Sequence, residues 1–327
     1  MKTLSAVLCA LFFAVPTFAA KQYSYFRVGN PNDTSTSTTP GTVLMGGGTD
    51  VDAAFQWMCQ RSGGGDFLVI RATGTDAYNP YIQALCPAEN SVATLIIPNR
   101  SAASDPFVIN AIQKAEALWI AGGDQSDYIN FWKGTPVETE LNNLIARGAP
   151  IGGTSAGMNV LSQFLYSALA SQGVTSSQAL ADPFNRYITL DQNFVNIANL
   201  HGLLDDPHFV TRDRMGRDLA FMCRVYLNGS SAAPRDIAID EQTALLVDGS
   251  GNASVVGIST VYFIKAPGAP QLCQAKTPLT YDNIAVYRIN ATGTFKLSTW
   301  EGTGGIAYTV SANAGVLSST QPGGSIY

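Results

Sequence analysis

Histidine is the scarcest residue type in this chain of 327 residues, with only His201 and His208 present. Two histidines exclude a histidine-rich metal site, and the absence of any Cys-x-x-Cys pair argues against a structural zinc site. Charged residues make up only 13% of the chain, and a net charge of −5 argues against nucleic acid as a partner. Thirty-one glycines and a hydrophobic content of 46% favour a folded, turn-rich protein. We therefore expect no metal and no other cofactor.

Long apolar runs are absent after residue 20, so the sequence predicts no transmembrane helix and no membrane partner. The first residues form a different pattern. Lys2 is followed by an apolar stretch from Leu4 to Val15, and the small residues Thr17 and Ala19 come after it. This pattern is typical of a signal peptide covering residues 1–19, with cleavage after Ala19. We therefore expect a secreted, extracellular protein.

Export to an oxidising compartment permits disulfide bonds. Four cysteines remain after Cys9 is removed with the signal peptide, and they allow three pairings. Closeness along the chain favours Cys59–Cys86 and Cys223–Cys273. Asn-x-Ser/Thr triplets are candidate glycosylation sites in an exported chain. They begin at Asn32, Asn99, Asn228, Asn252 and Asn290.

Short apolar runs alternate with helix-like segments up to the middle of the chain, which is typical of a parallel sheet covered on both faces. Glycine clusters follow these runs at 46–48, 122–123 and 152–153, at the sheet edge where such folds bind ligands. We predict one α/β domain over 20–327, whose β-rich extension at about 236–327 adds hairpins to the sheet edge. The expected helices lie at 51–60, 78–85, 106–117, 126–132 and 137–147.

The most informative segment is Gly152-Gly153-Thr154-Ser155-Ala156-Gly157, which follows an apolar run ending at Ile151. We predict strand, tight turn and helix here, with the helix carrying the apolar residues from Met158 to Leu165. Such a turn lifts a serine hydroxyl out of the sheet, close to backbone N–H groups that can bind an oxyanion. Ser155 is therefore the predicted nucleophile, and it needs a base.

The base must be one of the two histidines. His208 lies in a polar cluster, whereas His201 ends a loop, so we favour His208 and keep His201 as the alternative. A carboxylate should orient the histidine. No glutamate lies between Ser155 and His208, and the acids in this interval are Asp182, Asp191, Asp205 and Asp206. The last two are too near the histidine in sequence, and our choice is Asp182.

These segments resemble the cyanophycinase and dipeptidase E (aspartyl dipeptidase) family of serine peptidases, in its cyanophycinase-like branch. Residues 152–157 resemble the nucleophile motif of that family, residues 122–125 its second glycine turn, and residues 239–244 a further segment. Residues 206–217 follow its pattern Asp-Gln-His-Phe-x-x-Arg-x-Arg-x-x-Arg, except that Pro207 replaces the glutamine.

The resemblance covers roughly residues 42–265. It implies a flavodoxin-like, mostly parallel sheet with helices on both faces, related to class I glutamine amidotransferases. It also implies that Ser155 is the nucleophile, that His208 is the base, and that the backbone N–H groups of Gly123 and Ala156 form the oxyanion hole. The positions that it places in the substrate pocket are Gln125, Asp206, Arg212, Arg214 and Arg217.

We therefore expect an exported serine peptidase that cleaves peptide or isopeptide bonds at aspartyl units through an acyl-enzyme on Ser155. Its expected partner is a peptide substrate with aspartyl or other acidic groups, and the sequence leaves a homodimer open. Two alternatives also stay open. One is a non-catalytic member of the same fold that binds acidic peptides, and the other is an esterase of the α/β-hydrolase type.

Overall fold

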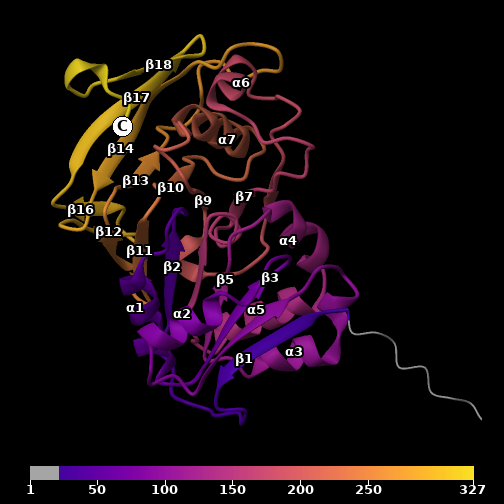
Figure 1. Ribbon diagram of the computed structural model, residues 1–327. Helices are drawn as coiled ribbons and strands as arrows, with labels where there is room; N and C mark the ends of the chain where they lie inside the picture. Colours follow the sequence, from indigo (N-terminus) through magenta and orange to yellow (C-terminus); the bar gives the residue numbers. More distant parts are fainter. Residues whose placement is uncertain (1–21) are drawn as a thin grey trace, which may run out of the picture.

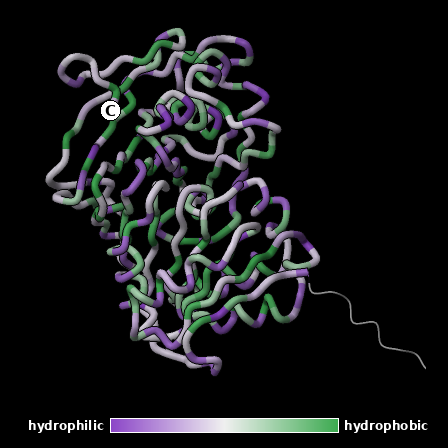
Figure 2. The backbone as a smooth tube through the Cα atoms, in the orientation of Figure 1, coloured by the Kyte–Doolittle hydropathy of each residue, from purple (hydrophilic) through white to green (hydrophobic). Residues whose placement is uncertain are grey.

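The computed structural model describes residues 22–327, so the predicted signal peptide, its cleavage point and Cys9 lie outside the described residues. Two sheets dominate this part of the chain: one occupies the lower half of Figure 1 and extends up its left side, and the other lies in the upper half. Hydrophobic stretches, green in Figure 2, follow the strands inside the molecule. Among residues 22–327, no helix has the length and apolar character needed to cross a membrane.

The lower sheet has ten strands, and its five central strands are parallel in the order β4-β3-β5-β6-β2. Strand β1 pairs antiparallel with β4 at one edge, and β11, β12, β15 and β16 extend the other edge. The strands are β1 (Ser24–Gly29), β2 (Gly41–Met45), β3 (Asp66–Arg71), β4 (Ser91–Ile96), β5 (Ala117–Ile120), β6 (Ile151–Thr154), β11 (Thr243–Asp248), β12 (Asn252–Gly257), β15 (Thr294–Lys296) and β16 (Glu301–Thr303).

Helices cover both faces of the parallel strands because successive strand side chains point to opposite sides. Phe67 of β3 packs with Phe55 of the first helix on one face, whereas Leu68 belongs to the core on the other face, which also contains Ile112 and Leu141. The prediction of a mostly parallel sheet with helices on both faces is therefore confirmed. The helices are α1 (Asp52–Ser62), α2 (Tyr78–Leu85), α3 (Pro106–Gln113), α4 (Gln125–Trp132) and α5 (Pro136–Ala146), with a 3-10 turn η1 (Ala102–Ser104).

The upper sheet has six strands in the order β18-β17-β14-β13-β10-β9, and only the β9–β10 pair among these is parallel. Helices α6 and α7 contribute to a separate apolar core against it. Its strands are β9 (Leu203–Asp206), β10 (Arg235–Ile239), β13 (Val261–Lys265), β14 (Tyr281–Ile289), β17 (Ile306–Asn313) and β18 (Val316–Ser319). The remaining elements are β7 (Phe164–Tyr166), α6 (Ser176–Ala181), β8 (Leu190–Gln192), η2 (Ala198–Leu200), α7 (Met215–Leu227) and η3 (Pro322–Gly324).

This second sheet corrects part of the prediction for the region after residue 235. Strands β11, β12, β15 and β16 do extend the edge of the first sheet, as expected. The other strands of the region build the upper sheet instead, because after β10 consecutive pairs of strands alternate between the two sheets. Hydrophobic periodicity predicts that a segment is a strand, but it does not identify the neighbour with which that strand pairs.

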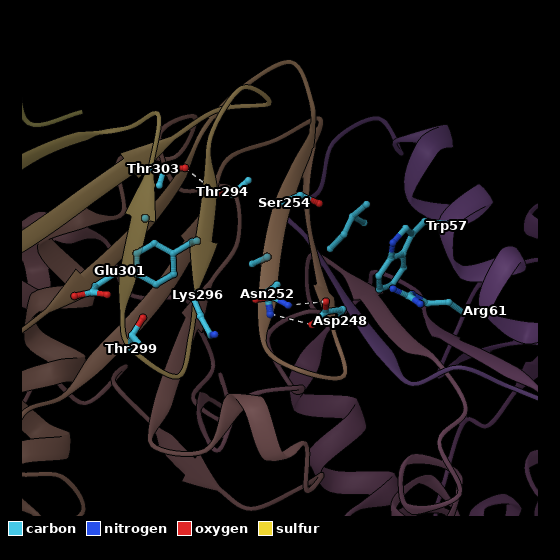
Figure 3. Close-up of a pocket in the computed structure, with 14 residues that line it drawn as sticks. Trp57, Arg61, Asp248, Asn252, Ser254, Thr294, Lys296, Thr299, Glu301 and Thr303 are labelled. Carbon is cyan, nitrogen blue, oxygen red and sulfur yellow. Dashed lines mark hydrogen bonds between the residues drawn. The ribbon is translucent and has the colours of Figure 1, made fainter.

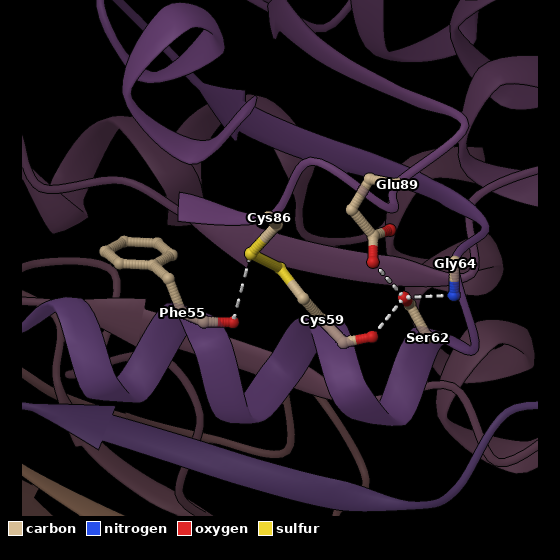
Figure 4. Close-up of a disulfide and its surroundings, with 6 residues drawn as sticks. All are labelled: Phe55, Cys59, Ser62, Gly64, Cys86 and Glu89. Carbon is tan, nitrogen blue, oxygen red and sulfur yellow. Dashed lines mark hydrogen bonds between the residues drawn. A yellow bond between two sulfur atoms is a disulfide. The ribbon is translucent and has the colours of Figure 1, made fainter. Parts of the chain in front are cut away.

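Each half of the molecule contains one disulfide bond, and both are the pairings that sequence distance favours. Cys59–Cys86 joins α1 to the end of α2, with 6.2 Å between the Cα atoms (Figure 4). Beside it, the Ser62 hydroxyl lies 2.6 Å from Glu89 Oε1, and burial raises the pKa of Glu89 to about 7. Cys223–Cys273 ties α7 to the segment before β14, with 6.5 Å between the Cα atoms.

Candidate active site

Ser155 follows β6 at the carboxyl edge of the parallel sheet. Its φ of 53° lies in the left-handed region, which residues other than glycine rarely adopt. Its N–H donates to the carbonyl oxygen of Met45 at 3.0 Å. Gly157 lies so close to the carbonyl oxygens of Ile120 and Ala121 that a Cβ would overlap them. Backbone geometry therefore holds the serine in a sharp turn, as the glycine spacing predicts.

The predicted helix after Ser155 is wrong. Residues 155–163 form successive turns, and the chain then enters strand β7. The N–H of Asn159 does donate to the Ser155 carbonyl at 3.0 Å, but the Asn159 side chain donates to the Asp205 carbonyl at 3.1 Å and fixes the turns against β9. The apolar residues of this segment, such as Val160, are buried because the segment crosses the interior, so their spacing does not mark one face of a helix.

His208 lies just beyond β9 and directs its ring to Ser155. The ring atom Nε2 is 2.6 Å from Ser155 Oγ. The backbone N–H of His208 donates to the Gly46 carbonyl at 2.7 Å. The backbone at His208 is also left-handed, with a φ of 51°. Gly47, with a φ of 99°, lies against the ring at a point where any Cβ would overlap it. The ring of His201 contacts Asn196 instead, so the structure brings His208 and not His201 to the serine.

The carboxylate at His208 is Glu241, in the connection between β10 and β11. Its Oε1 atom is 2.6 Å from His208 Nδ1. The prediction of Asp182 is wrong, because that carboxylate accepts the N–H groups of Phe184 and Lys276, each at 2.9 Å. Glu241 follows the histidine in sequence, outside the interval between serine and histidine in which the carboxylate was expected. The family-like segment at 239–244 contains Glu241 and was the signal that could have revealed it.

The surroundings of His208 favour its neutral form. Burial lowers the pKa of His208 below its ordinary value, and the positive charges of Arg212 and Arg214 lower it further, while the hydrogen bond to Glu241 acts in the opposite direction. The carboxylate at Nδ1 selects the tautomer in which Nδ1 carries the proton. Nε2 is then free to accept a proton from the Ser155 hydroxyl.

The second glycine turn lies beside the serine. A Cβ placed on Gly122 would be 3.5 Å from the Ser155 Cβ. Within residues 22–327, the N–H groups of Gly123 and Ala156 donate to no backbone or side-chain acceptor. Free N–H groups close to a serine hydroxyl are what an oxyanion hole requires.

The arginines after His208 occupy different surroundings. Arg217 is 4% exposed, and its Nε donates to Asp206 Oδ2 at 2.7 Å while its Nη2 binds Oδ1 of the same carboxylate. Arg214 donates to Asp206 at 3.1 Å and to the Pro207 carbonyl at 2.7 Å, and burial lowers the pKa of Arg214 to about 10. Asp206 is only 1% exposed. The expectation that Asp206 and Arg217 contact substrate is therefore corrected, because they form a buried ion pair that positions Arg214.

Two of the expected substrate-binding residues stay accessible. The Arg212 side chain is 53% exposed, and its Nε is 3.8 Å from Glu241 Oε1. Gln125 begins α4 and is partly exposed, and its amide donates to the Tyr166 carbonyl at 3.3 Å. Both side chains can reorient toward a ligand without exposing a buried charge.

A groove of about 820 Å³ lies elsewhere, between α1 and the hairpin edge of the ten-stranded sheet (Figure 3). Trp57, Arg61 and Lys296 are among its lining residues, whereas Ser155 and His208 are not. This groove is therefore separate from the candidate active site. In the part of the chain that the structure describes, no group of histidine, cysteine and acidic residues is arranged to hold a metal ion.

A serine, a histidine and a carboxylate in consecutive hydrogen-bond contact are the arrangement that serine hydrolases use. A model of Peptidase family S51 matches residues 72–255, which is more than half of the chain. The chain belongs to this family.

Two cyanophycinases, from Synechococcus elongatus and from Thermosynechococcus vestitus (strain NIES-2133 / IAM M-273 / BP-1), are each 25% identical to the chain over 221 residues. The match covers 63% of this chain and 61% of each relative, so it spans less than two thirds of their length. The crystal structure of a peptidase from an acI-B1 Actinobacterium superposes with a TM-score of 0.53 at 16% identity. It covers 80% of this chain and 98% of that one, which supports the fold.

Proposed function

We propose that this chain is an exported serine peptidase-like hydrolase that cleaves peptide or isopeptide bonds at aspartyl units. The observation that carries the proposal is the continuous contact from Ser155 through His208 to Glu241, with 2.6 Å at each step. Family membership supports a serine peptidase-like hydrolase. The positive charges of Arg212 and Arg214 near His208 support an acidic substrate, because guanidinium groups bind carboxylates with two parallel hydrogen bonds.

In the proposed reaction, Ser155 Oγ attacks the substrate carbonyl carbon while its proton passes to His208 Nε2. Glu241 stabilises the resulting imidazolium, and the N–H groups of Gly123 and Ala156 stabilise the oxyanion. The carbon–nitrogen bond then breaks, and His208 gives its proton to the leaving amine. Water attacks the acyl-enzyme ester, passes a proton to His208 and releases the acid, and the proton returns to Ser155 Oγ.

The substrate contacts in this proposal come from Arg212, Arg214 and Gln125. Arg212 is exposed and can turn to pair with a carboxylate of the aspartyl unit, whereas Arg214 is held in place by the buried Asp206. Pro207 offers no side-chain donor at the position where the cyanophycinase pattern has glutamine. We therefore expect a smaller set of polar contacts with the substrate than that pattern provides.

We also propose that the chain is exported, with residues 1–19 removed and residues 20–327 acting as one unit. The two disulfide bonds support maturation in an oxidising compartment. The unit includes both sheets because the serine follows a strand of one and the histidine a strand of the other. Glycosylation remains a prediction. Asn99 is a weaker candidate than the other four asparagines, because its side chain is less exposed. The exposed candidates are Asn32, Asn228, Asn252 and Asn290.

The variant Ser155→Ala tests the proposal. We expect it to lower the hydrolysis of β-aspartyl-arginine by at least about 10³-fold, because the nucleophile is lost. We expect its melting temperature to stay near that of the wild type, since only one partly exposed hydroxyl is removed. Equal turnover by the two proteins would contradict the proposal.

Two further measurements separate the alternatives. A fluorophosphonate probe should label Ser155 in the folded wild type, and a folded protein that resists labelling would favour the non-catalytic, peptide-binding alternative. Faster turnover of p-nitrophenyl butyrate than of aspartyl peptides would favour the esterase.

A further inference from the structure

Tyr327, at the end of the sequence, packs against the segment that carries His208 and Arg214. Its hydroxyl donates to Asp213 Oδ1 at 2.9 Å and accepts the N–H of Met215, where α7 begins, at 2.9 Å. Its ring lies edge-on to Phe209, with 5.6 Å between the ring centroids. Phe209 directly follows His208, so Tyr327 contacts the segment close to both of its ends.

Tyr327 is itself held in place by the upper sheet. The hydroxyl of Tyr308, on β17, donates to the Ile326 carbonyl at 3.0 Å. The Ser325 hydroxyl and the Gln321 amide donate to the Tyr327 carbonyl at 2.8 and 3.3 Å. The Tyr327 ring also contacts Tyr262 of β13, with 6.2 Å between centroids. A fixed side chain of this kind can transmit the position of the sheet to the neighbouring segment.

The segment from His208 to Arg214 needs such support, because it is irregular and strained. His208 and Asp213 both have left-handed backbones, with φ values of 51° and 50°, and such residues persist only where their surroundings hold them. On one side, Asp240 accepts the N–H groups of Val210 and Thr211 at 3.2 and 2.9 Å. Tyr327 adds support on either side of these bonds, at Phe209 and at Asp213.

We propose that Tyr327 is a positioning residue for the hydrolase, which keeps the His208 ring on Ser155 and Arg214 at the site. The inference rests on the proposed function. The match to the family model ends at residue 255, so Tyr327 lies outside the matched region. Burial raises the pKa of the Tyr327 hydroxyl, which therefore remains a donor to Asp213 around neutral pH.

The test compares Tyr327→Phe and Tyr327→Ala with the control Tyr281→Phe. Tyr281 is a buried residue of β14, in the upper sheet. Its hydroxyl donates to the Gly268 carbonyl at 2.6 Å and makes no hydrogen bond to the His208 segment. We expect kcat for β-aspartyl-arginine to fall about threefold in Tyr327→Phe and about tenfold or more in Tyr327→Ala, with a smaller change in KM, because catalysis is sensitive to small displacements of the base. Tyr281→Phe should keep the wild-type kcat.

The pH dependence of kcat/KM gives a readout that a merely structural role would not move. Displacing the His208 segment changes the burial of the ring and its distance from Glu241, so the acidic limb should shift in both Tyr327 variants and not in Tyr281→Phe. If Tyr327→Ala fails to fold, Tyr327→Phe carries the test alone. Wild-type kcat and pH profile in the Tyr327 variants, or equal losses in Tyr281→Phe, would overturn the inference. An inactive wild type would instead overturn the proposed function.

Discussion

The two halves of the molecule position their active-site residues by different means. In the lower half, the backbone fixes Ser155 through a left-handed φ, a hydrogen bond to Met45 and a glycine that leaves no room for a Cβ. His208 also has a left-handed φ and a backbone hydrogen bond to Gly46, but its segment depends in addition on side chains far along the chain, namely Glu241 and Tyr327. The turn at Ser155 leaves a pattern of six consecutive residues with flanking glycines, whereas contacts with remote side chains leave no local pattern.

The largest effect should come from breaking the side-chain support with Glu241→Gln. We expect kcat/KM to fall by about 10³- to 10⁴-fold, because glutamine no longer selects the tautomer with a free Nε2 and no longer stabilises the imidazolium. The hydrogen bond to Glu241 raises the pKa of His208, so its loss should move the acidic limb of any residual activity to lower pH. The measurement is hydrolysis of an aspartyl dipeptide as a function of pH.

Asp182→Asn is the matched control for that variant. Asp182 accepts two backbone N–H groups in a turn, and asparagine retains an acceptor oxygen, so activity should stay within about twofold of the wild type. A loss in Asp182→Asn with normal activity in Glu241→Gln would show that the carboxylate is wrongly assigned.

The next largest effect should come from a variant that disturbs the contact between Gly47 and the His208 ring. In Gly47→Ala, the new methyl group would overlap the His208 ring and displace it from Ser155, and we expect a loss of kcat of about 10²-fold. Gly202→Ala is the control, because Gly202 also has a positive φ, of 72°, but no heavy atom lies within 4 Å of the position that its Cβ would occupy. That variant should lose about 1 kcal/mol of stability through backbone strain and keep its activity. Equal activity losses would mean that strain, and not the overlap, is responsible.

The smallest expected effect is on stability and compares one buried acid in each half. Burial raises the pKa of Glu89 to about 7 in the lower half and that of Asp236 to about 7 in the upper half. Both folded values exceed the ordinary value near 4, so their stabilising contribution is complete below about pH 4 and is lost as the pH rises to about 7. The urea midpoint should therefore fall across this interval.

Glu89→Gln and Asp236→Asn should each make that fall smaller, because neither variant has a proton to lose at the position. Urea unfolding at several pH values between 4 and 7 measures the slope for each protein. An unchanged slope in Asp236→Asn would show that ionisation of this buried carboxyl does not limit stability in the upper half.

The same contrast explains how much could be predicted from the sequence. Continuous apolar runs such as Phe67–Ile70 predicted the parallel strands, because burial on both faces leaves a local pattern. The turn at Ser155 was predicted from its glycines. The segment after it was misread as a helix, since buried turns and helix faces can carry similar apolar spacing. Glu241 was missed because the carboxylate was sought between Ser155 and His208, whereas Glu241 follows His208 and reaches it through the way the two sheets meet.

The order of these residues along the chain also determines how much of the chain the site requires. His208 comes 53 residues after Ser155, Glu241 comes 33 residues after His208, and Tyr327 comes at the end of the sequence. If the chain is shortened to end before residue 208, we expect it to lack the proposed activity, because the imidazole and the carboxylate both come from later residues.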